Sequence, residues 1–401
     1  MGGIRAFKFA KYLPLFGWNP LVITTPLAAK SKKDDSLLVE LSQDIEIHRP
    51  FFLNIRKYLR GDILKLLRPL EKKYLFPDKY VLWNSSVYKY IVRHIIPATI
   101  IDATYVSMGP HSSMFIAHRL KQQFHIPFFL DFRDPFSFYQ YTVLDQNAER
   151  AIRAKMVETG IFQHADAINI VTTPWMEKYA ELYPEFSHKM SDIHNGYDEA
   201  DFVDIPDHKG KNKFFTIGYN GTFSRLEPLN PLIDAITEIH REKGITIQLN
   251  IATSTSISKI RKDFSYAISN GLINYKGFLP HRDSLINLKQ SDASLLSLLP
   301  VPATEGQIPA KTYEYFRIKN PIICLNRPDG HIAKLIERTK TGVIVDINNY
   351  RGIVETLLDM NMKWKKNQLD YSPDLSEIQK FERKNQTKVL ARKFKALLLS
   401  A

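Results

Sequence analysis

The sequence has almost no cysteine and no long apolar run. Of its 401 residues only Cys324 is a cysteine, which excludes an internal disulfide framework and a multi-cysteine metal site. No apolar stretch reaches the ~18 residues that a membrane-spanning helix needs. The best candidate, residues 90–101, is interrupted by Arg93, His94 and Pro97. The first ten residues also lack the continuous apolar segment of a secretory signal.

Several well-known site signatures are missing as well. The sequence contains neither the G-x-G-x-x-G fingerprint of dinucleotide-binding folds nor the G-x-x-x-x-G-K-[ST] phosphate loop. It has no G-x-S-x-G elbow, and its 12 histidines show no H-x-x-x-H spacing. We therefore expect no bound metal and no other cofactor.

Positive charge is in excess and unevenly distributed. Lysine and arginine number 55 against 42 acidic residues, a net charge of +13. The segment 49–93 alone holds eleven basic residues and three acidic ones. Such a segment favours an anionic partner, either a lipid surface or a phosphorylated substrate, although a solvated basic face is the alternative. We expect no specific nucleic-acid partner, because no base-stacking motif or recognition helix accompanies the charge.

Short apolar runs alternate with longer amphipathic stretches along the whole chain, without an internal repeat. This alternation predicts an α/β fold with parallel sheets covered by helices on both faces. The predicted helices include 111–123, 228–243 and 258–270. The predicted strands are 21–24, 102–107, 127–132, 167–172, 214–219, 246–252, 273–276, 293–298, 321–325 and 343–346.

The chain is too long for a single core, and a polar segment at 198–213 suggests a boundary. We predict an N-terminal domain over 1–205, a C-terminal domain over 206–375 and a basic amphipathic helix over 376–401. That helix is expected to dock on the core rather than insert into a membrane. No residues before Met1 supply a first strand, so either the N-terminal domain starts atypically or the natural chain begins earlier.

In the first half, two segments place polar side chains at the ends of predicted strands. His111 lies in the loop SMGPHSS, between a strand and a helix. Arg133 and Asp134 belong to DFRDP, where an apolar strand runs straight into three charges. Sites of α/β proteins gather at this edge of a sheet. Each segment also has a purely structural interpretation. SMGPHSS would be a capping loop with a surface histidine, and in DFRDP an ion pair between Arg133 and one carboxylate would fix the loop.

In the second half, two loops favour a phosphorylated ligand. The loop GYNGTFSR, at 218–225, contains glycines and ends in Arg225, which can pair with an anion. The segment EGQIPAKTYEY follows an apolar strand and opens a helix. The N–H groups of residues 306–308, together with Lys311, favour phosphate there. Glu314, one turn further on, can accept two hydroxyls from one ribose. The alternative is an ordinary ion pair on a surface helix.

Taken in order, these segments resemble the family-four type of GT-B glycosyltransferase, and within it the subgroup that builds bacterial cell-surface polysaccharides. The resemblance runs from Gly2 to about Asn348, with PAKxxEY and DFRDP as its most specific blocks. It implies two Rossmann-like domains whose parallel sheets face a central cleft. The C-terminal domain would bind a nucleotide-sugar and the N-terminal domain the acceptor. Sugar transfer would retain the anomeric configuration, usually without a metal.

The resemblance also implies roles for individual residues. Glu314 matches the glutamate that holds the donor ribose, and Arg225 and Lys311 match cations that neutralise the diphosphate. The catalytic residues it implies are His111, Arg133, Asp134, Arg225 and Lys311. The other donor-site residues are Gly3, Gly221, Phe278, Leu279, Glu305, Gly306, Gln307 and Ile308.

The sequence departs from the family pattern at one of its two glutamates. The usual spacing of seven intervening residues would place the first glutamate at Gly306. Either the neighbouring Glu305 takes that role through a shifted loop, or the chain dispenses with it.

The expected function is transfer of a sugar from a UDP- or GDP-sugar to a lipid-diphosphate-linked or saccharide acceptor. The basic first half would meet an anionic membrane surface, which implies a cytoplasmic protein held peripherally at the inner face of the cytoplasmic membrane. Two alternatives stay open. One is a nucleotide-sugar epimerase of the same fold, which needs no acceptor, and the other is a non-catalytic glycosyltransferase-like subunit.

Overall fold

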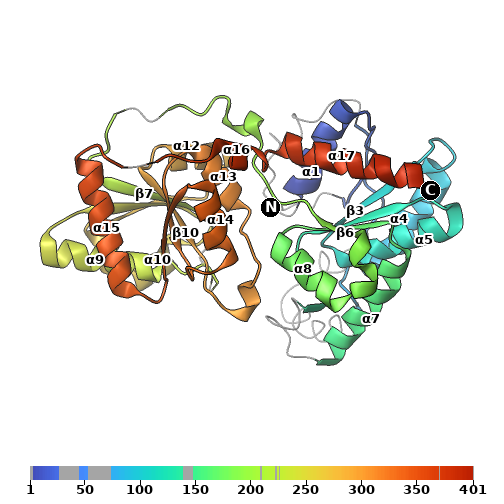
Figure 1. The fold of residues 1–401 in the computed structure, drawn as a ribbon, viewed down its shortest axis with the longest axis horizontal. Helices are drawn as coiled ribbons and strands as arrows, with labels where there is room; N and C mark the ends of the chain where they lie inside the picture. The colour runs from blue at the N-terminus through green and yellow to red at the C-terminus, as the bar shows by residue number, and fades with distance from the viewer. Residues whose placement is uncertain are drawn as a thin grey trace. The chain divides into compact units, whose positions relative to one another are not determined.

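The chain forms two compact units, each with a parallel β-sheet (Figure 1). The computed structural model describes residues 3–26, 45–52, 74–138, 148–207, 210–221, 224, 226–369 and 371–400. Unit 1 comprises Met1–His194 together with Lys384–Ala401, and unit 2 comprises Asn195–Arg383. The division falls earlier than the expected 205/206 boundary, because Tyr197 and Phe202 are buried in the core of unit 2.

The main sheet of unit 1 has four parallel strands in the order β3-β4-β5-β6. Strand β4, FFLDF, is buried at every position, which is typical of a parallel sheet covered on both faces. Strands β1 and β2 form a separate parallel pair. The strands are β1 (Val22–Ile23), β2 (Ile47–His48), β3 (Thr104–Met108), β4 (Phe128–Phe132), β5 (Ala167–Ile170) and β6 (Met190–Asp192).

The helices of unit 1 cover this sheet and include one stretch of π-helix, at Ile91–Ile95, that continues α4. Short 3₁₀ turns occur at Leu13–Phe16, His111–Ser113 and Pro184–Lys189. The α-helices are α1 (Ile4–Tyr12), α4 (Val81–Tyr90), α5 (Met114–Phe124), α7 (Ala148–His164), α8 (Thr173–Leu182) and α17 (Arg383–Ser400).

Unit 2 contains a six-stranded parallel sheet in the order β12-β11-β10-β7-β8-β9. Its strands are β7 (Phe215–Asn220), β8 (Ile247–Ala252), β9 (Ile273–Gly277), β10 (Ala293–Ser297), β11 (Ile322–Leu325) and β12 (Gly342–Val345). Its helices are α9 (Asn230–Lys243), α10 (Ile257–Asp263), α11 (Ser265–Ser269), α12 (His281–Lys289), α13 (Lys311–Ile318), α14 (His331–Thr339), α15 (Tyr350–Lys365) and α16 (Leu375–Gln379), with 3₁₀ turns at Glu199–Phe202 and Pro302–Thr304. The helix predicted over 258–270 is therefore two short helices.

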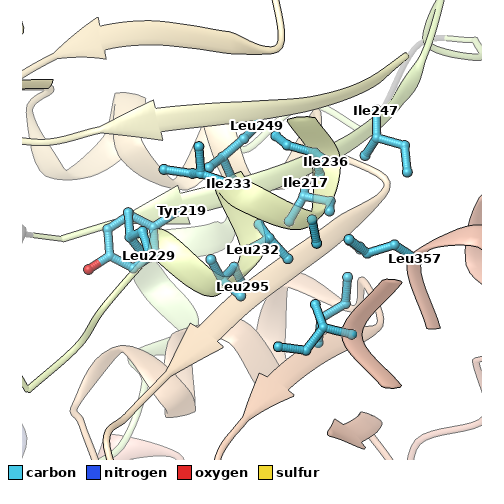
Figure 2. Close-up of a cluster of buried hydrophobic side chains, with 14 of the residues drawn as sticks. Ile217, Tyr219, Leu229, Leu232, Ile233, Ile236, Ile247, Leu249, Leu295 and Leu357 are labelled. Atoms are coloured by element: carbon cyan, nitrogen blue, oxygen red, sulfur yellow. The ribbon is translucent and has the colours of Figure 1, made fainter. Parts of the chain in front are cut away.

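Helix α9 shows how the sequence builds the core of unit 2 (Figure 2). Leu232, Ile233, Ile236 and Ile239 recur at helical spacing and are buried against strands of the sheet. Gly244, with φ of +65°, ends the helix in the left-handed conformation that glycine adopts at low cost. Each fully buried Leu or Ile contributes about 1.5–3 kcal/mol, so this face holds α9 to the sheet.

The C-terminal helix predicted over 376–401 is in fact two helices, α16 in unit 2 and α17 in unit 1. Main-chain contacts separate them: Tyr197 donates its N–H to the Phe381 carbonyl at 3.1 Å, and Arg383 donates its N–H to the Tyr197 carbonyl at 2.7 Å. The apolar pattern runs through the break without interruption because Phe381 is buried in unit 2 and Phe394 in unit 1.

Helix α17 docks on unit 1, as predicted for the terminal helix. Leu390 and Phe394 are buried in one cluster with Phe9 and Leu13 from the start of the chain and Phe129 from β4. Helices α1 and α17, at opposite ends of the sequence, thus lie side by side (Figure 1). Within the described ranges, no helix is both long enough and apolar enough to cross a membrane.

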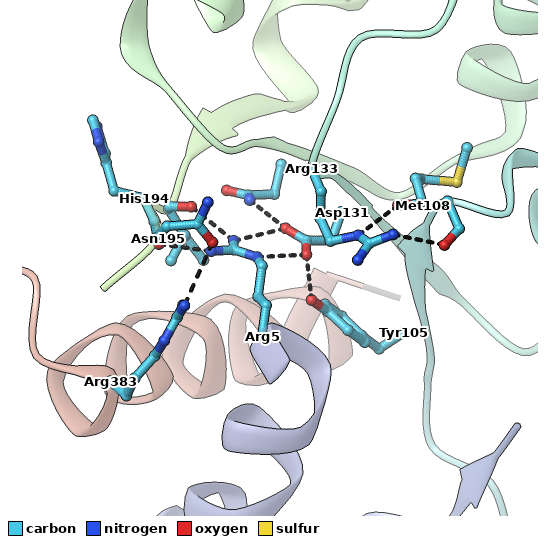
Figure 3. A network of polar contacts seen from close by, with 11 residues as sticks. Arg5, Tyr105, Met108, Asp131, Arg133, His194, Asn195 and Arg383 are labelled. Carbon is cyan, nitrogen blue, oxygen red and sulfur yellow. Dashed lines mark hydrogen bonds and ion pairs between the residues drawn. The ribbon is translucent and has the colours of Figure 1, made fainter. Parts of the chain in front are cut away.

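Arg5 and Asp131 form a buried ion pair that joins distant segments of unit 1 (Figure 3). The Arg5 guanidinium, on α1, donates to both carboxylate oxygens of Asp131, on β4, each at 2.8 Å. It also donates to the carbonyls of Ile193 at 2.7 Å and His194 at 2.6 Å, just after β6. Neither side chain is more than 3% exposed, so the pair fixes α1 to the sheet.

Asp131 accepts two further hydrogen bonds, from the Tyr105 hydroxyl at 2.5 Å and from Asn169 at 2.6 Å. Burial favours the neutral acid, but the Arg5 charge and the hydrogen bonds outweigh it, so the pKa of Asp131 lies below its ordinary value. Burial and the nearby carboxylate raise the pKa of Tyr105. The alternative of a bridge to Arg133 is wrong for this carboxylate, whose partner is Arg5.

We expect Asp131→Asn to lower the free energy of unfolding by about 3–5 kcal/mol, because it leaves the Arg5 charge buried without its counter-charge. Denaturant unfolding at neutral pH measures the loss. The control Glu181→Gln removes the exposed Lys178–Glu181 pair and should cost less than about 1 kcal/mol. A similarly small loss for both variants would contradict the prediction.

The pKa of Asp131 is lower in the folded protein than in the unfolded chain. Its ionised form therefore stabilises the fold above the pKa of an unfolded aspartate, near 3.9, and this stabilisation disappears on further acidification.

Candidate functional site

The predicted donor-site residues gather around the loop after β10 and the first turn of α13. Thr304 ties this loop together: its hydroxyl donates to the Leu299 carbonyl at 2.5 Å and accepts the Val301 N–H at 3.3 Å. Gly306 follows with φ of +73°, a conformation that favours glycine. The loop thereby places Lys311 at the C-terminal edge of the sheet, where sites of α/β proteins form.

Lys311, the first residue of α13, forms a polar cluster with Tyr219 and Glu227. Tyr219 is the penultimate residue of β7, and Glu227 lies in the loop that follows this strand. Its ammonium forms an ion pair with Glu227, lies 4.3 Å from the ring centroid of Tyr219 and donates to the Tyr219 hydroxyl at 3.3 Å. Burial lowers the pKa of Lys311, against the opposing charge of Glu227. Gly221 is packed against this cluster, since a Cβ there would lie 3.0 Å from the Lys311 ammonium.

Glu314, one turn beyond Lys311, lies beside a histidine that sequence analysis did not assign to the site. Nε2 of His281 is 3.0 Å from Oε1 of Glu314, and the two side chains are 28% and 29% exposed. His281 is the first residue of α12. Its contact with Glu314 joins two helices that are separate in the sequence, so no local spacing could have indicated it.

Glu305 and Gly306 occupy different environments. Glu305 is 58% exposed, and its Oε1 lies 3.2 Å from Nε2 of His331, the first residue of α14. Gly306 and Ile308 are buried, and the buried Oε1 of Gln307 has no hydrogen-bond partner within the described part of unit 2. Each predicted glutamate therefore lies beside a histidine that begins a helix.

The remaining donor-site positions are more scattered. Phe278 is 56% exposed in the turn between β9 and α12, with the half-buried Leu279 next to it. Gly3 is in unit 1, where it caps the start of α1 and its carbonyl accepts the N–H of Phe7 at 2.9 Å. Arg225 lies outside the described residues.

In unit 1, His111, Arg133 and Asp134 lie together beyond β3 and β4. Arg133 donates to the carbonyls of residues 108 and 109 at 2.8 and 2.6 Å (Figure 3). The His111 ring stacks on Phe136 with centroids 4.6 Å apart and hydrogen-bonds to the Asp134 main chain. Its Nε2 is buried and has no hydrogen-bond partner among the described residues. Burial lowers the pKa of His111, so the ring is neutral at neutral pH.

The predicted basic segment 49–93 is described only in part. At its described end a basic hollow opens between α4, its π-helical continuation and α5, lined by Ser85, Tyr88, Lys89, Val92, Arg93 and Arg119. The Arg119 guanidinium lies over the Tyr88 ring, 3.8 Å from the centroid. Arg49 and Lys79 are described but do not line this hollow. The remaining cations of the segment lie outside the described residues: Arg56, Lys57, Arg60, Lys65, Arg68, Lys72 and Lys73.

No protein-family model and no curated protein match the sequence. Solved structures, in contrast, match nearly the whole chain. Sucrose-phosphate synthase from Thermosynechococcus elongatus has a TM-score of 0.65 and 15% identity, over 99% of this chain and 94% of that one. A glycosyltransferase from Rickettsia africae has a TM-score of 0.62 and 16% identity, over 100% and 96%. HepE of Anabaena, solved with UDP and glucose, has a TM-score of 0.58 and 13% identity, over 98% and 96%.

These matches confirm the predicted fold class. The chain has the α/β fold of the GT-B glycosyltransferases, with parallel sheets in both units. At such low identities the likeness concerns the fold alone. The assignments of single residues therefore rest on the local geometry described above.

We expect Gly221→Ala to cost more stability than Gly271→Ala. Both glycines have positive φ, +152° and +69°, so alanine is strained at either position, by about 1–3 kcal/mol. Only at position 221 would the new Cβ also meet the Tyr219 hydroxyl at 2.9 Å and the Lys311 ammonium at 3.0 Å, whereas position 271 has nothing within 4 Å. Thermal unfolding compares the two variants. Equal losses would show that Gly221 is not packed against this cluster.

Proposed function

We propose that the chain is a glycosyltransferase that moves a sugar from a nucleotide-sugar to an acceptor. One observation carries the proposal: a cation and a carboxylate, Lys311 and Glu314, share the first turn of a helix at the C-terminal edge of a sheet, in a chain with the GT-B fold. HepE, which has this fold, was solved with UDP-glucose. A nucleotide-sugar carries a diphosphate and a ribose, the two groups that an ammonium and a carboxylate bind well.

In the proposed donor complex, Glu314 accepts the ribose hydroxyls while His281 holds one of its oxygens. Lys311 and Arg225 neutralise the diphosphate. The N–H of Gln307, predicted to assist them, instead donates to the Thr304 carbonyl at 2.9 Å, which leaves the N–H of Ile308 for that contact. In this complex Lys311 exchanges its present partner, Glu227, for the diphosphate, which carries more negative charge than a single carboxylate. These cations supply the charge that a metal would otherwise provide, so the proposed reaction needs no metal.

The proposed transfer retains the anomeric configuration. The acceptor hydroxyl attacks the anomeric carbon on the face from which the diphosphate leaves. Its oxygen forms the new C–O bond as the bond to the diphosphate breaks, and its proton passes to a phosphate oxygen. Lys311 and Arg225 stabilise the charge that builds on the leaving group. His111, whose Nε2 has no hydrogen-bond partner in the described parts of the chain, is assigned to the sugar and the acceptor, as are Arg133 and Asp134.

The acceptor that we propose is a lipid-diphosphate-linked or saccharide intermediate of cell-surface polysaccharide synthesis, used by an enzyme held peripherally at the inner face of the cytoplasmic membrane. The basic hollow of unit 1 supports this. Lys89, Arg93 and Arg119 form no ion pair with another described residue. The half-buried Val92 lines the hollow, and Leu82, at the start of α4, is 47% exposed. Cations beside exposed apolar side chains bind anionic bilayer surfaces.

For the donor, we expect one of UDP and GDP to bind the wild-type protein in calorimetric titration. Glu314→Ala should weaken that binding at least about tenfold, because two charge-assisted hydrogen bonds to the ribose are lost. The control Glu355→Ala removes an exposed carboxylate of α15 and should bind as the wild type does. Absence of binding by both nucleotides, or equal binding by wild type and Glu314→Ala, would refute the proposed donor site.

Turnover then separates the alternatives. Incubation with the sugar donor alone would yield an epimeric nucleotide-sugar if the chain were an epimerase, and no product if an acceptor is required. A chain that binds the nucleotide but transfers no sugar to lipid-diphosphate or saccharide acceptors would be a non-catalytic subunit.

For the membrane, we expect the protein to float with vesicles of phosphatidylcholine and phosphatidylglycerol, and not with phosphatidylcholine alone. Replacing Lys89, Arg93 and Arg119 together by glutamine should weaken binding roughly 100-fold, at about 1 kcal/mol for each cation. A control that replaces the exposed Lys178, Lys259 and Lys366 changes the net charge equally. Equal loss in the two triple variants would assign binding to net charge rather than to the hollow.

A further inference from the structure

Glu158 is a buried carboxylate that the proposed mechanism does not use. It lies on α7, is fully buried and forms no ion pair with another described residue. Its donors are the Tyr179 hydroxyl at 2.8 Å, the Tyr183 hydroxyl at 2.5 Å and the N–H of Ser137 at 3.2 Å, together with the Ser137 side chain. Burial raises the pKa of Glu158, although these hydrogen bonds oppose the shift. A buried acid without a counter-charge destabilises the fold. The contacts of Glu158 therefore indicate which segment it holds in place.

The hydrogen bonds of Glu158 end on the loop that follows Asp134. The Tyr179 hydroxyl, which donates to Glu158, also accepts the N–H of Phe136 at 2.9 Å. Glu158 itself takes the next N–H, that of Ser137. One buried acid therefore fixes two successive main-chain groups, the first through a tyrosine and the second directly.

Phe136, whose main chain is held in this way, contacts the ring of His111. Phe136 is fully buried, and its ring stacks on the imidazole with an interplanar angle of 24°. The main chain of Asp134, two residues earlier, hydrogen-bonds to the same imidazole. The charged groups that face His111 are Asp78, Asp134 and Arg133. With both ring contacts supplied by segment 134–136, the position of the imidazole depends on how firmly that segment is held.

We propose that Glu158 and Tyr179 are positioning residues for His111, acting through Phe136 to hold the imidazole with its Nε2 free of protein partners among the described residues. The inference rests on the proposed function, which assigns His111 to the reaction centre. The placement of the ring is nevertheless measurable without any turnover, so the two can fail separately.

The two tyrosines provide a matched pair of variants. Both are buried and both donate to Glu158. Only the Tyr179 hydroxyl binds the main chain of the loop, whereas that of Tyr183 lies 3.3 Å from the side chain of Ser137. Tyr179→Phe and Tyr183→Phe thus each remove one buried hydrogen bond to the acid, and only the first cuts the connection to Phe136.

The experiment is NMR of the full chain carrying ¹⁵N- and ¹³C-labelled histidine, titrated between about pH 5 and 8, with the His111 signals assigned from His111→Gln. Tyr179→Phe should shift the ring signals of His111 and move its midpoint up towards the ordinary value near 6.5, because a loosened ring is less desolvated. Tyr183→Phe should leave both unchanged. In sugar transfer, Tyr179→Phe should lower kcat at least about tenfold with KM for the nucleotide-sugar unaltered.

Unchanged His111 signals in Tyr179→Phe would overturn the proposal, as would equal shifts in both tyrosine variants, which would indicate a general loss of stability. Glu158→Gln supplies a second measurement: its amide oxygen still accepts from Tyr179 and Ser137, so the His111 signals should stay near those of the wild type, while Glu158→Leu should reproduce Tyr179→Phe. If His111 responds as expected but no sugar is transferred to any acceptor, the proposed function fails and the positioning role stands.

Discussion

The buried ion pair between Arg5 and Asp131 is the constraint on which the site-bearing end of unit 1 depends. Hydrogen bonds from α1, β3 and β5 converge on one carboxylate, while the guanidinium also holds the main chain after β6. A buried pair is stable only if its remaining polar atoms are satisfied, and several partners do so here. Arg133 and Asp134 follow Asp131 after only one residue, the buried Phe132, so their loop starts from a fixed point. The hydrogen bonds of Glu158 fix the loop again a few residues later.

Lys311 in unit 2 differs from Arg5 in unit 1 in burial and in the number of its partners. Arg5 is permanently charged, is almost fully buried and has all its contacts within the protein. Lys311 is less deeply buried, pairs with one carboxylate and carries a lowered pKa. A compact ammonium on a flexible stem can change partners with small movements, which suits a group that would exchange Glu227 for a phosphate. Under the proposed function, the rigid guanidinium of Arg5 serves the structure of unit 1, and the adaptable ammonium of Lys311 serves ligand binding.

The sequence was most informative where a signal is local. Continuous apolar runs bounded by turn residues predicted β4, β10 and β11 almost to their ends, since strands buried on both faces leave that pattern. The short β2 and β6 have no such run, and the break between α16 and α17 is hidden because apolar residues on each side face different cores. At the candidate site, motifs placed Lys311 and Glu314 correctly on one helix. Their partners Glu227 and His281 come from other segments, and tertiary packing selects such partners without any local spacing.

The return of the chain to unit 1 has a consequence for biosynthesis. Unit 1 is discontinuous: its first part ends at His194, and helix α17 joins it only after the whole of unit 2 has been made. On the ribosome, unit 2 can complete its core before α17 has been synthesised. Until then the cluster around Phe9, Leu13 and Phe129 lacks the side chains of Leu390 and Phe394 that complete it. The nascent N-terminal segment therefore presents an unfinished apolar surface while unit 2 is being synthesised, a surface that a chaperone can occupy until α17 packs against it.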